Sequence, residues 1–337
     1  MIPNDAVLLE HGSGGLLTHE LIATVFLRHL RNFCLERLED GAVLEVQGMR
    51  LCLTTDSYVV SPIFFPGGDI GSLAVYGTVN DLAVCGGRPL ALSCSVIIEE
   101  GFSLKTLDAV CASMAVAASR AQVQIVTGDT KVVPKGKGDG IYITTTGIGL
   151  VTYHAPLAIS QIQPGDALIL SNTIGDHGAA ILCSRENIEL ASPLTSDSAP
   201  LSAMIERLLA ASPRIHCMRD ITRGGLGGIL AEIALQRGLT LYIDERAIPV
   251  QEQVRGVCET FGFDPLFLAN EGNMVLICDA GDADKIVQIM REYPCGRHAT
   301  VIGTVSGQTD ARVIMKTCIG GERIVELPTG ELVPRIC

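Results

Sequence analysis

The stretch Val123-Gln124-Ile125-Val126-Thr127-Gly128-Asp129-Thr130-Lys131 decides the fold class, because an apolar β-branched run ends there in a glycine and polar groups. The run predicts a strand over 123–127. Apolar residues at helical spacing precede it and predict a helix over 103–121, with Ser103 as N-cap. A second β-branched run predicts a strand over 141–151. Helices and strands therefore alternate, which is typical of α/β folds.

The same alternation extends in both directions along the chain. Further helices are predicted at 20–31, 72–86, 176–187, 199–211, 225–237, 250–261 and 281–292, and further strands at 51–55, 90–98, 167–171, 239–243, 273–278 and 299–305. A break near 153–163 predicts two α/β domains, 1–155 and 156–308. In the remaining extension, 309–337, Gly320-Gly321 lies between two β-rich runs and predicts a hairpin with a type I′ turn.

The composition limits the classes of function. The 337 residues exceed one ordinary core, and 47% hydrophobic with 18% charged residues is typical of a globular chain. The net charge of −12 argues against nucleic acid or an anionic membrane as the main partner. The N-terminus lacks the pattern of a secretion signal and no apolar run is long enough to span a bilayer, so we expect a soluble cytoplasmic protein.

The cysteines do not form a recognisable framework. All 12 are scattered, without a C-x-x-C pair, so neither disulfides nor a zinc site are expected. Four lie in apolar runs and are predicted to be small buried residues: Cys52, Cys94, Cys183 and Cys278.

Acidic residues at the ends of predicted elements suggest a metal site. Asp56 follows a strand, Asp129 follows another, and Asn80-Asp81 interrupts an otherwise apolar helix. Carboxylates are the hard oxygen ligands that Mg²⁺ takes when it accompanies a polyphosphate. The alternative is that Asp56 and Asp129 are turn or cap residues.

Gly128-Asp129-Thr130-Lys131 places a carboxylate, a hydroxyl and an ammonium within three residues. The Lys131 ammonium could stabilise a phosphate or a developing oxyanion. The alternative is an exposed loop lysine.

Two glycine-rich segments could bind an anion. His11-Gly12-Ser13-Gly14-Gly15 offers backbone amides in a loop, and Asp220 is followed by Gly224-Gly225 at the start of a predicted helix. Free N–H groups at a helix N-terminus attract phosphate. Close helix packing is an equal explanation for any single glycine. His177, at the start of another helix, is interpreted as a cap residue.

Glu271 and Cys337 are the candidate reactive groups. Glu271 lies between an apolar run and Gly272, where partial burial would raise its pKa and suit it as a general base, although a turn carboxylate is as good an explanation. Cys337 ends the chain on Pro334-Arg335-Ile336 and could swing into a pocket, although chain ends are often simply loose. Its own α-carboxylate should raise the thiol pKa, partly offset by Arg335.

Together these motifs resemble the HypE family of hydrogenase maturation carbamoyl dehydratases, in the superfamily of aminoimidazole ribonucleotide (AIR) synthetase, selenophosphate synthetase and thiamine-phosphate kinase. The resemblance covers nearly the whole chain, and the terminal motif is its most specific part. It rests on His-Gly-Ser-Gly-Gly at 11–15, Thr-Asp-Ser-Tyr at 55–58, Phe-Phe-Pro-Gly-Gly at 64–68, Gly-Asp-Thr-Lys at 128–131, Gly-Asp-His-Gly at 175–178, Arg-Asp-Ile-Thr-Arg-Gly-Gly at 219–225, Ala-Asn-Glu-Gly at 269–272 and Pro-Arg-Ile-Cys at 334–337. Relatives often carry a basic residue where this chain has Asn273.

The resemblance implies two PurM-like (AIR synthase-like) domains and an ATP-dependent dehydration. A carbamoyltransferase, HypF, would load Cys337, ATP would phosphorylate the carbamoyl oxygen, and the resulting thiocyanate would pass its cyano group to iron on a HypC–HypD scaffold. Cys337, Lys131 and Glu271 would be catalytic, and Asp56, Asp81 and Asp129 would hold Mg²⁺. The nucleotide would be bound by these carboxylates with His11, Gly12, Asn80, Gly128, Thr130, Asp220, Gly224 and Gly225. The superfamily also implies a homodimer with nucleotide sites near the interface.

Two rival functions remain open on the sequence. Another ATP enzyme, of the selenophosphate or thiamine-phosphate type, would not need a terminal thiol, and a selenophosphate synthetase would be expected to carry a reactive cysteine in the loop 11–15, which has none. A non-enzymatic thiol carrier would use Cys337 but would not need Lys131, Glu271 or the aspartates.

Overall fold

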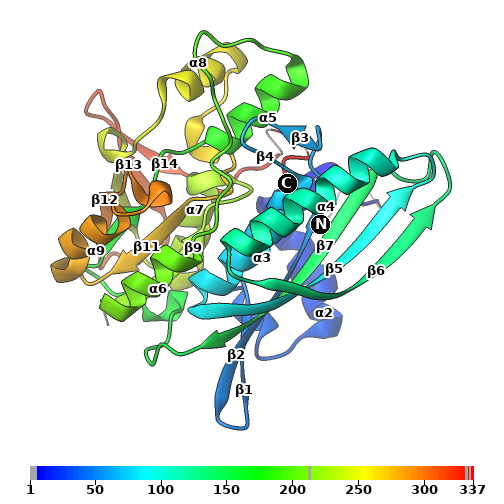
Figure 1. Cartoon of the computed structure of the whole chain (residues 1–337). Coiled ribbons are helices and arrows are strands. Elements are labelled where there is room, and N and C mark those ends of the chain that lie inside the picture. Colours follow the sequence, from blue (N-terminus) through cyan, green and yellow to red (C-terminus); the bar gives the residue numbers. More distant parts are fainter. Residues whose placement is uncertain (1–5, 212–213, 331–332, 334) are drawn as a thin grey trace.

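The computed structural model describes residues 6–211, 214–330, 333 and 335–337, which form two α/β domains packed side by side (Figure 1). The N-terminal domain contains a five-stranded sheet in the order β1-β2-β7-β5-β6. Among the described residues of this sheet, β5 and β6 pair in parallel and the other neighbours are antiparallel. The strands are β1 (Ala42–Val46), β2 (Met49–Tyr58), β5 (Gly87–Glu99), β6 (Gln124–Val133) and β7 (Ile141–Val151).

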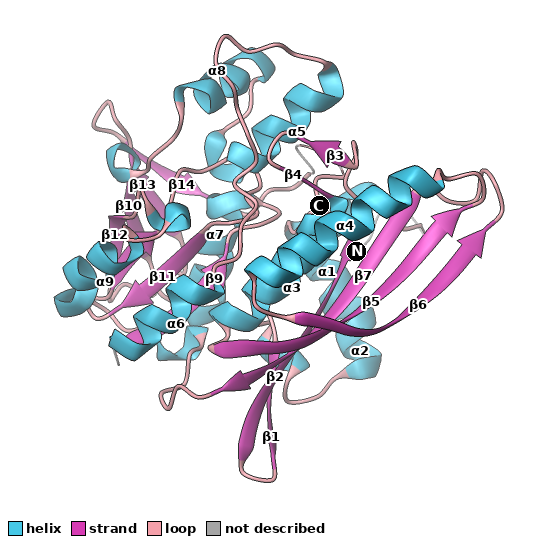
Figure 2. Cartoon of the chain, viewed as in Figure 1, coloured by secondary structure: helices cyan, strands magenta, loops and turns pink. Residues whose placement is uncertain are grey.

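Two long helices, α3 (Ile70–Val84) and α4 (Leu104–Arg120), lie along one face of this sheet (Figure 2). A two-stranded hairpin, β3 (Phe64–Phe65) and β4 (Gly68–Asp69), leads into α3, and Asp69 caps that helix by accepting N–H bonds from Gly71 and Ser72. Every residue of α3 is buried, because the sheet, α4 and the second domain together surround the helix. The polar residues of α3 therefore need partners. Thr78 finds them on the sheet, in Tyr58 and Thr145, whereas Asn80 and Asp81 lie where the two domains meet.

The C-terminal domain is built on a seven-stranded sheet in the order β14-β13-β10-β12-β8-β11-β9. One core lies between this sheet and α6 and α9, a second lies against α7, and α5 and α8 share a core with α3 of the first domain. The strands are β8 (Ala167–Leu170), β9 (Ile215–Asp220), β10 (Leu241–Asp244), β11 (Met274–Cys278), β12 (Thr300–Val305), β13 (Val313–Lys316) and β14 (Glu322–Val325). The helices are α5 (Asp176–Glu186), α6 (Ser202–Ala211), α7 (Gly225–Arg237), α8 (Glu252–Phe261) and α9 (Ala283–Met290).

Short helical segments join these elements. The N-terminal segment runs through η1 (Leu9–Gly12), α1 (Leu16–Leu21), the π-helix η2 (Ile22–Phe26) and α2 (Leu27–Leu30). Single 3₁₀ turns occur at η3 (Leu35–Arg37), η4 (Ile159–Gln161), η5 (Glu245–Ala247), η6 (Pro265–Phe267), η7 (Ala280–Asp282) and η8 (Pro294–Gly296). In the part of the chain that the structure describes, no helix combines the length and apolar character needed to cross a bilayer.

Several sequence predictions of structure need correction. The strand predicted to end at Thr127 continues to Val133, because its pairing with β5 runs on to Glu99. The strands β1 and β9 and the short β3–β4 hairpin were not predicted. The predicted hairpin at the end of the chain is present as β13–β14, but residues 317–321 connect its strands, so the two-residue type I′ turn was wrong.

Candidate functional site

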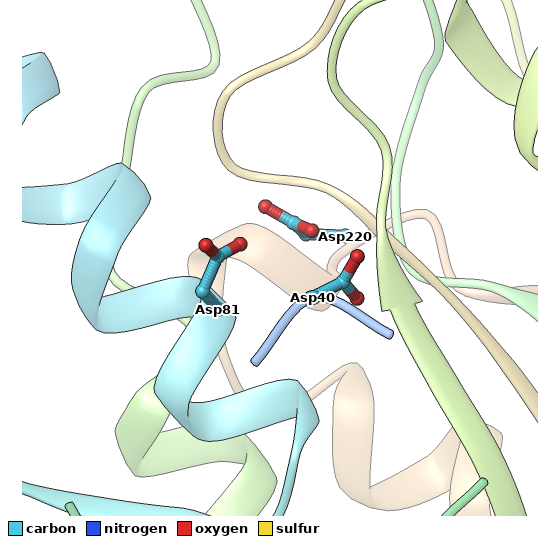
Figure 3. Close-up of side chains that lie close together, drawn as sticks. All are labelled: Asp40, Asp81 and Asp220. Atoms are coloured by element: carbon cyan, nitrogen blue, oxygen red, sulfur yellow. The ribbon is translucent and has the colours of Figure 1, made fainter. Parts of the chain in front are cut away.

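Three carboxylates converge between the domains. Asp40 precedes β1, Asp81 projects from α3 and Asp220 ends β9, and one oxygen of each lies within 4.8 Å of the others (Figure 3). Asp81 lies on the buried helix α3 of the first domain, and the contact between the domains places Asp220 of β9 beside it. Asp56 on β2 lies close enough for its charge to raise the pKa of Asp81 and of Asp220.

This acidic cluster, Asp40–Asp81–Asp220, is electrostatically unfavourable unless a further cation joins Arg219, which pairs with Asp40. Burial raises the pKa of Asp40 to about 6, and burial with like-charge repulsion raises the pKa values of Asp81 and Asp220. The Oδ2 atom of Asp40 is buried without a hydrogen-bond partner among the described residues. Converging hard oxygens with an unused lone pair fit Mg²⁺, which takes carboxylate ligands together with substrate phosphates.

Neighbouring side chains fix the cluster in place. The Thr54 hydroxyl is 2.7 Å from Oδ2 of Asp81 and 2.8 Å from the carbonyl oxygen of Asp40, so it links the two residues. The Arg219 guanidinium pairs with Asp40, with Nε 2.7 Å from Oδ1. Asp81 and Asp40 are therefore oriented by side chains from both domains.

The C-terminal thiol lies in the same interdomain region. Cys337 is 9% exposed, and Glu271, Arg223 and Asp56 surround its sulfur closely enough to act on its pKa. That pKa is raised chiefly by burial and partly offset by Arg223, with Glu271 and Asp56 raising it further. The sequence predicted a raised pKa from the α-carboxylate and an offset from Arg335. The direction is correct, but burial is the main cause and Arg223 is the compensating cation.

Glu271 lies beside this thiol on the loop before β11. The residue is 4% exposed, and burial raises its pKa well above the usual range, with the Asp197 and Asp220 charges adding to the effect. Asp197 holds the loop by accepting the N–H groups of Glu271 at 3.0 Å and Gly272 at 3.1 Å. A carboxyl with a raised pKa is a stronger proton acceptor once ionised, as a general base requires.

Asn80 is used to hold the main chain around Glu271. Its amide nitrogen donates to the carbonyl of Ala199 at 3.0 Å and lies 3.4 Å from that of Glu271, and its Oδ1 accepts the N–H of Leu201 at 2.8 Å. The structure thus places Asn80 at the site as a positioning group.

The segment 128–131 does not join the acidic cluster within one chain. Gly128 on β6 and Asp56 on β2 occupy the same row of the sheet, with β7 and β5 between them. Neighbouring strands are about 4.8 Å apart, so the three strand-to-strand spacings between Asp56 and Gly128 add up to about 14 Å. The next residue, Asp129, projects to the opposite sheet face. The expectation that Asp56, Asp81 and Asp129 meet in one chain is therefore wrong.

Lys131 and Thr130 are exposed on β6 with Asp129. The Lys131 ammonium pairs with Asp129 at 2.7 Å, and the two side chains are 68% and 58% exposed. This pair lies two residues apart on one face of an edge strand, and it lowers the pKa of Asp129.

The two glycine-rich segments come together beside the tail. Ser13 and Gly224 line a small cavity of about 30 Å³ with Arg223 and Ile336. His11 is buried and its Nδ1 accepts the N–H of Leu8 at 2.9 Å, whereas a Cβ on Gly12 would meet open space. Gly225 begins α7 at φ +63°, where a Cβ would lie 2.4 Å from the carbonyl oxygen of Leu266, so glycine is required there.

Sequence reasoning missed three charged residues of this site. Asp40 precedes a strand that was not predicted, and its sequence context, Asp40-Gly41, indicates only a turn. Arg219 and Arg223 flank Asp220 in a motif from which only the carboxylate and the glycines were selected. Of the four cysteines predicted to be buried, Cys52, Cys183 and Cys278 are buried and Cys94 is half-buried.

Family comparisons cover most of the chain. Residues 38–151 match the N-terminal domain of AIR synthase related proteins, and residues 163–316 match their C-terminal domain. Carbamoyl dehydratase HypE of Azotobacter vinelandii is 49% identical over 334 residues, which cover 99% of this chain and 98% of that protein.

Solved structures of HypE proteins are also similar to this chain. A crystal structure of hydrogenase maturation protein HypE in complex with ATP has a TM-score of 0.83 and 46% identity, and the match covers 98% of this chain and 100% of that one. A HypE–HypF complex contains a chain with a TM-score of 0.87 and 44% identity, covering 91% of this chain and 99% of that one.

Proposed function

The chain belongs to the HypE family of carbamoyl dehydratases, and on this premise we propose that it dehydrates a carbamoyl group carried on the thiol of Cys337, using ATP, to supply a cyanide ligand for [NiFe] hydrogenase. The observation that carries this proposal is the position of the Cys337 sulfur. It lies beside Glu271 in the interdomain region that also holds Asp40, Asp81 and Asp220.

The chemistry balances as an ATP-driven loss of water. The carbamoyl oxygen attacks the γ-phosphorus of ATP, ADP leaves, and one N–H proton is lost to give an O-phosphorylated imidate on the sulfur. The C–O bond then breaks, the second N–H proton is lost, and inorganic phosphate leaves with the carbamoyl oxygen. The product is a thiocyanate on Cys337. Phosphorylation is needed because an amide oxygen is a very poor leaving group.

The residues around the sulfur suit these steps. Glu271 is buried next to the site of proton loss, and its raised pKa makes it an effective acceptor for an N–H proton. Arg223 lies near Cys337 and Glu271, so its cation would stabilise negative charge on the carbamoyl oxygen or on the transferring phosphoryl group. Arg223 thus takes, within one chain, the charge role that the sequence suggested for Lys131.

The carboxylates and the glycine-rich segments support the proposed binding of magnesium and nucleotide. Asp40, Asp81 and Asp220, with Asp56 nearby, would hold Mg²⁺, which would neutralise charge on the phosphates. The N-terminus of α7 at Gly224 and Gly225, with the loop of His11 and Gly12 beside it, would supply N–H groups to phosphate.

A homodimer would give Gly128, Asp129, Thr130 and Lys131 a place near a nucleotide. The sheet face opposite α3 and α4 exposes Leu53 and its cross-strand partner Ile148, 42% and 36% exposed. At the sheet edge, β6 pairs with β5 alone among the described strands. A second copy laid against this face would cover apolar surface that water now meets. It would also bring the Lys131–Asp129 pair of each copy to the interface.

The proposed partners act before and after dehydration. A carbamoyltransferase of the HypF type would load the thiol, a proposal supported by the solved complex of a relative with HypF. The cyano group would leave to iron on a HypC–HypD scaffold. We place these reactions in the cytoplasm.

Intact-mass analysis tests the reaction class. The chain is carbamoylated by its partner enzyme and then given ATP and Mg²⁺. The C-terminal peptide should lose the mass of one water, and a Cys337→Ala chain should neither gain the carbamoyl group nor lose water. Retention of the carbamoyl mass with ATP turnover would instead indicate a small-molecule kinase or synthetase, whose turnover would survive deletion of Cys337. No ATP hydrolysis under any loading would indicate a thiol carrier.

A further inference from the structure

Main-chain and side-chain hydrogen bonds together hold the last three residues, and the Arg185 guanidinium donates to the carbonyl of Arg335 at 3.1 Å. The N–H of Val59 donates to the carbonyl of Cys337 at 2.9 Å, and the N–H of Ser61 donates to the carbonyl of Arg335 at 3.1 Å. The Arg335 side chain donates back to the carbonyl of Val59 at 3.1 Å. The tail therefore lies along the segment after β2 and accepts its N–H groups at alternate residues, although Arg335 has φ +55° and residues 335–337 form no regular strand.

His177 binds the peptide unit that precedes Cys337. Its Nε2 lies 2.7 Å from the carbonyl oxygen of Ile336, and its Nδ1 lies 2.7 Å from the Ser196 hydroxyl. A carbonyl can only accept, so Nε2 carries the proton. Burial lowers the pKa of His177 to about 4, so the ring is neutral near pH 7 and Nδ1 accepts from Ser196.

The surroundings of His177 fix the ring in this orientation. The side chain is 0% exposed, and its ring meets the Phe65 ring edge-on at a centroid distance of 5.3 Å. Ser196 is held in turn by the N–H of Ser198 at 3.1 Å. A helix-cap role, as the sequence suggested, would not require a donor aimed at a segment 159 residues away.

We propose that His177 is a positioning residue that latches the terminal peptide and so holds the Cys337 sulfur at Glu271. The proposal rests on the proposed function, in which the tail carries the reacting group. The latch binds a main-chain carbonyl, so it does not depend on what the sulfur carries. The His177 contact should have two opposite effects, because the thiol is buried when the tail is docked. The contact should speed dehydration, which needs the docked tail, and slow carbamoyl loading, which needs the tail released.

Two substitutions of His177 distinguish the effect of its N–H donor from the effect of its ring. His177→Phe keeps a ring against Phe65 and removes the N–H, whereas His177→Gln keeps an N–H donor of similar reach. His154→Phe, on an exposed histidine, is the matched control. Ser196→Ala removes the group that fixes the tautomer while leaving His177 in place, and it should give an intermediate effect.

The rate of thiol alkylation of the full chain, without ATP or a partner, measures how often the tail is released, because the docked Cys337 thiol is buried. The rate at Cys337 is compared with that at Cys318, which is exposed in the same molecule. His177→Phe should raise the Cys337 rate about tenfold, the size expected for one buried hydrogen bond, and leave Cys318 unchanged. His177→Gln and His154→Phe should stay within about twofold of the parent.

Single-turnover kinetics then test the opposing effects. Carbamoyl loading of His177→Phe should be faster, and dehydration after loading slower by about tenfold, with the glutamine variant restoring both rates. An unchanged Cys337 alkylation rate, or a fall in both rates, would overturn the latch. If Cys337 alkylation rises as expected but no chain, the parent included, loses water on ATP addition, the latch stands and the proposed function fails.

Discussion

The Arg219 guanidinium lies 2.7 Å from the Asp40 carboxylate, and both side chains are about one-tenth exposed. Arg219 also lies 3.8 Å from Glu232, which in turn binds His19 at 2.9 Å, so one buried cation serves several acids from both domains. Because Asp40 belongs to the acidic cluster, this pair links the stability of the domain interface to the candidate magnesium site.

Arg219→Ala should destabilise the protein strongly. Removal of one partner of a buried ion pair leaves the other charge uncompensated and costs about 3–5 kcal/mol. Urea unfolding followed by circular dichroism measures this loss, and Arg214→Ala is the control, since Arg214 is half exposed and pairs at the surface with Asp279 and Asp282. Its loss should cost no more than about 1 kcal/mol. Equal losses for the two variants would contradict a buried role for Arg219.

Asp220→Asn should stabilise the metal-free protein and abolish its response to Mg²⁺. The substitution removes one of three carboxylates that repel one another in a buried site, so the melting temperature without cation should rise. Added Mg²⁺ should raise the melting temperature of the parent, since a ligand stabilises the state that binds it, but not that of the variant. Asp279→Asn, outside the cluster, should respond to Mg²⁺ like the parent. A parent chain whose melting temperature ignores millimolar Mg²⁺ would exclude this cluster as a metal site.

The fold was largely predictable from sequence, whereas the site was only partly so. Periodicity located α3, α4 and α7 to within two residues, because long amphipathic or apolar runs carry strong signals. It missed β9, a six-residue strand whose last three residues are Met218, Arg219 and Asp220, because charged residues that are paired across domains look like loop residues in sequence. Asp40 was missed, and the separation of Asp129 from Asp56 and Asp81 within one chain was not foreseen, for the same reason: which carboxylates meet depends on strand order and sheet face.

Asp197 should make the metal-free protein less stable as the pH rises. Burial and the Asp176 charge raise its pKa from 3.8 to about 7. A carboxyl whose folded pKa lies above its unfolded value favours folding below the unfolded value, and this contribution is lost as the pH rises from about 4 to about 7. Urea midpoints between pH 4 and pH 8 should therefore fall more steeply in the parent than in Asp197→Asn. The variant will lose some stability at every pH, since an amide cannot accept both N–H groups of Glu271 and Gly272, so the slope is the decisive measurement. Parallel slopes would contradict the raised pKa.

Gly225→Ala and Gly256→Ala should have opposite effects. Gly225 has φ +63° and no room for a Cβ, so alanine there should cost more than about 1 kcal/mol and weaken nucleotide binding at the start of α7. Gly256 lies inside α8, and no neighbouring atom lies within 4 Å of the place that an alanine Cβ would take, so alanine should stabilise by about 0.5–1 kcal/mol. Thermal unfolding and ATP titration calorimetry measure both. A stabilised Gly225→Ala chain with normal ATP affinity would remove α7 from the nucleotide site.

Leu53→Asp should prevent self-association if a second copy covers the outer sheet face. Leu53 is 42% exposed and lies opposite Ile148, so a buried charge at this pair would oppose sheet-to-sheet contact and weaken the dimer at least about tenfold, roughly 1.4 kcal/mol. Ile319→Asp is the matched control, because Ile319 is 92% exposed in the β13–β14 loop, away from that sheet. Sedimentation equilibrium at micromolar concentration should show a dimer for the parent and for Ile319→Asp, and a monomer for Leu53→Asp. The ATP affinity and the dehydration activity of the Leu53→Asp monomer then show what Lys131 does. A loss of ATP affinity in the folded monomer would assign Lys131 and Asp129 to a site completed by the second copy. Full dehydration activity in the monomer would show that Arg223 and Glu271 suffice within one chain.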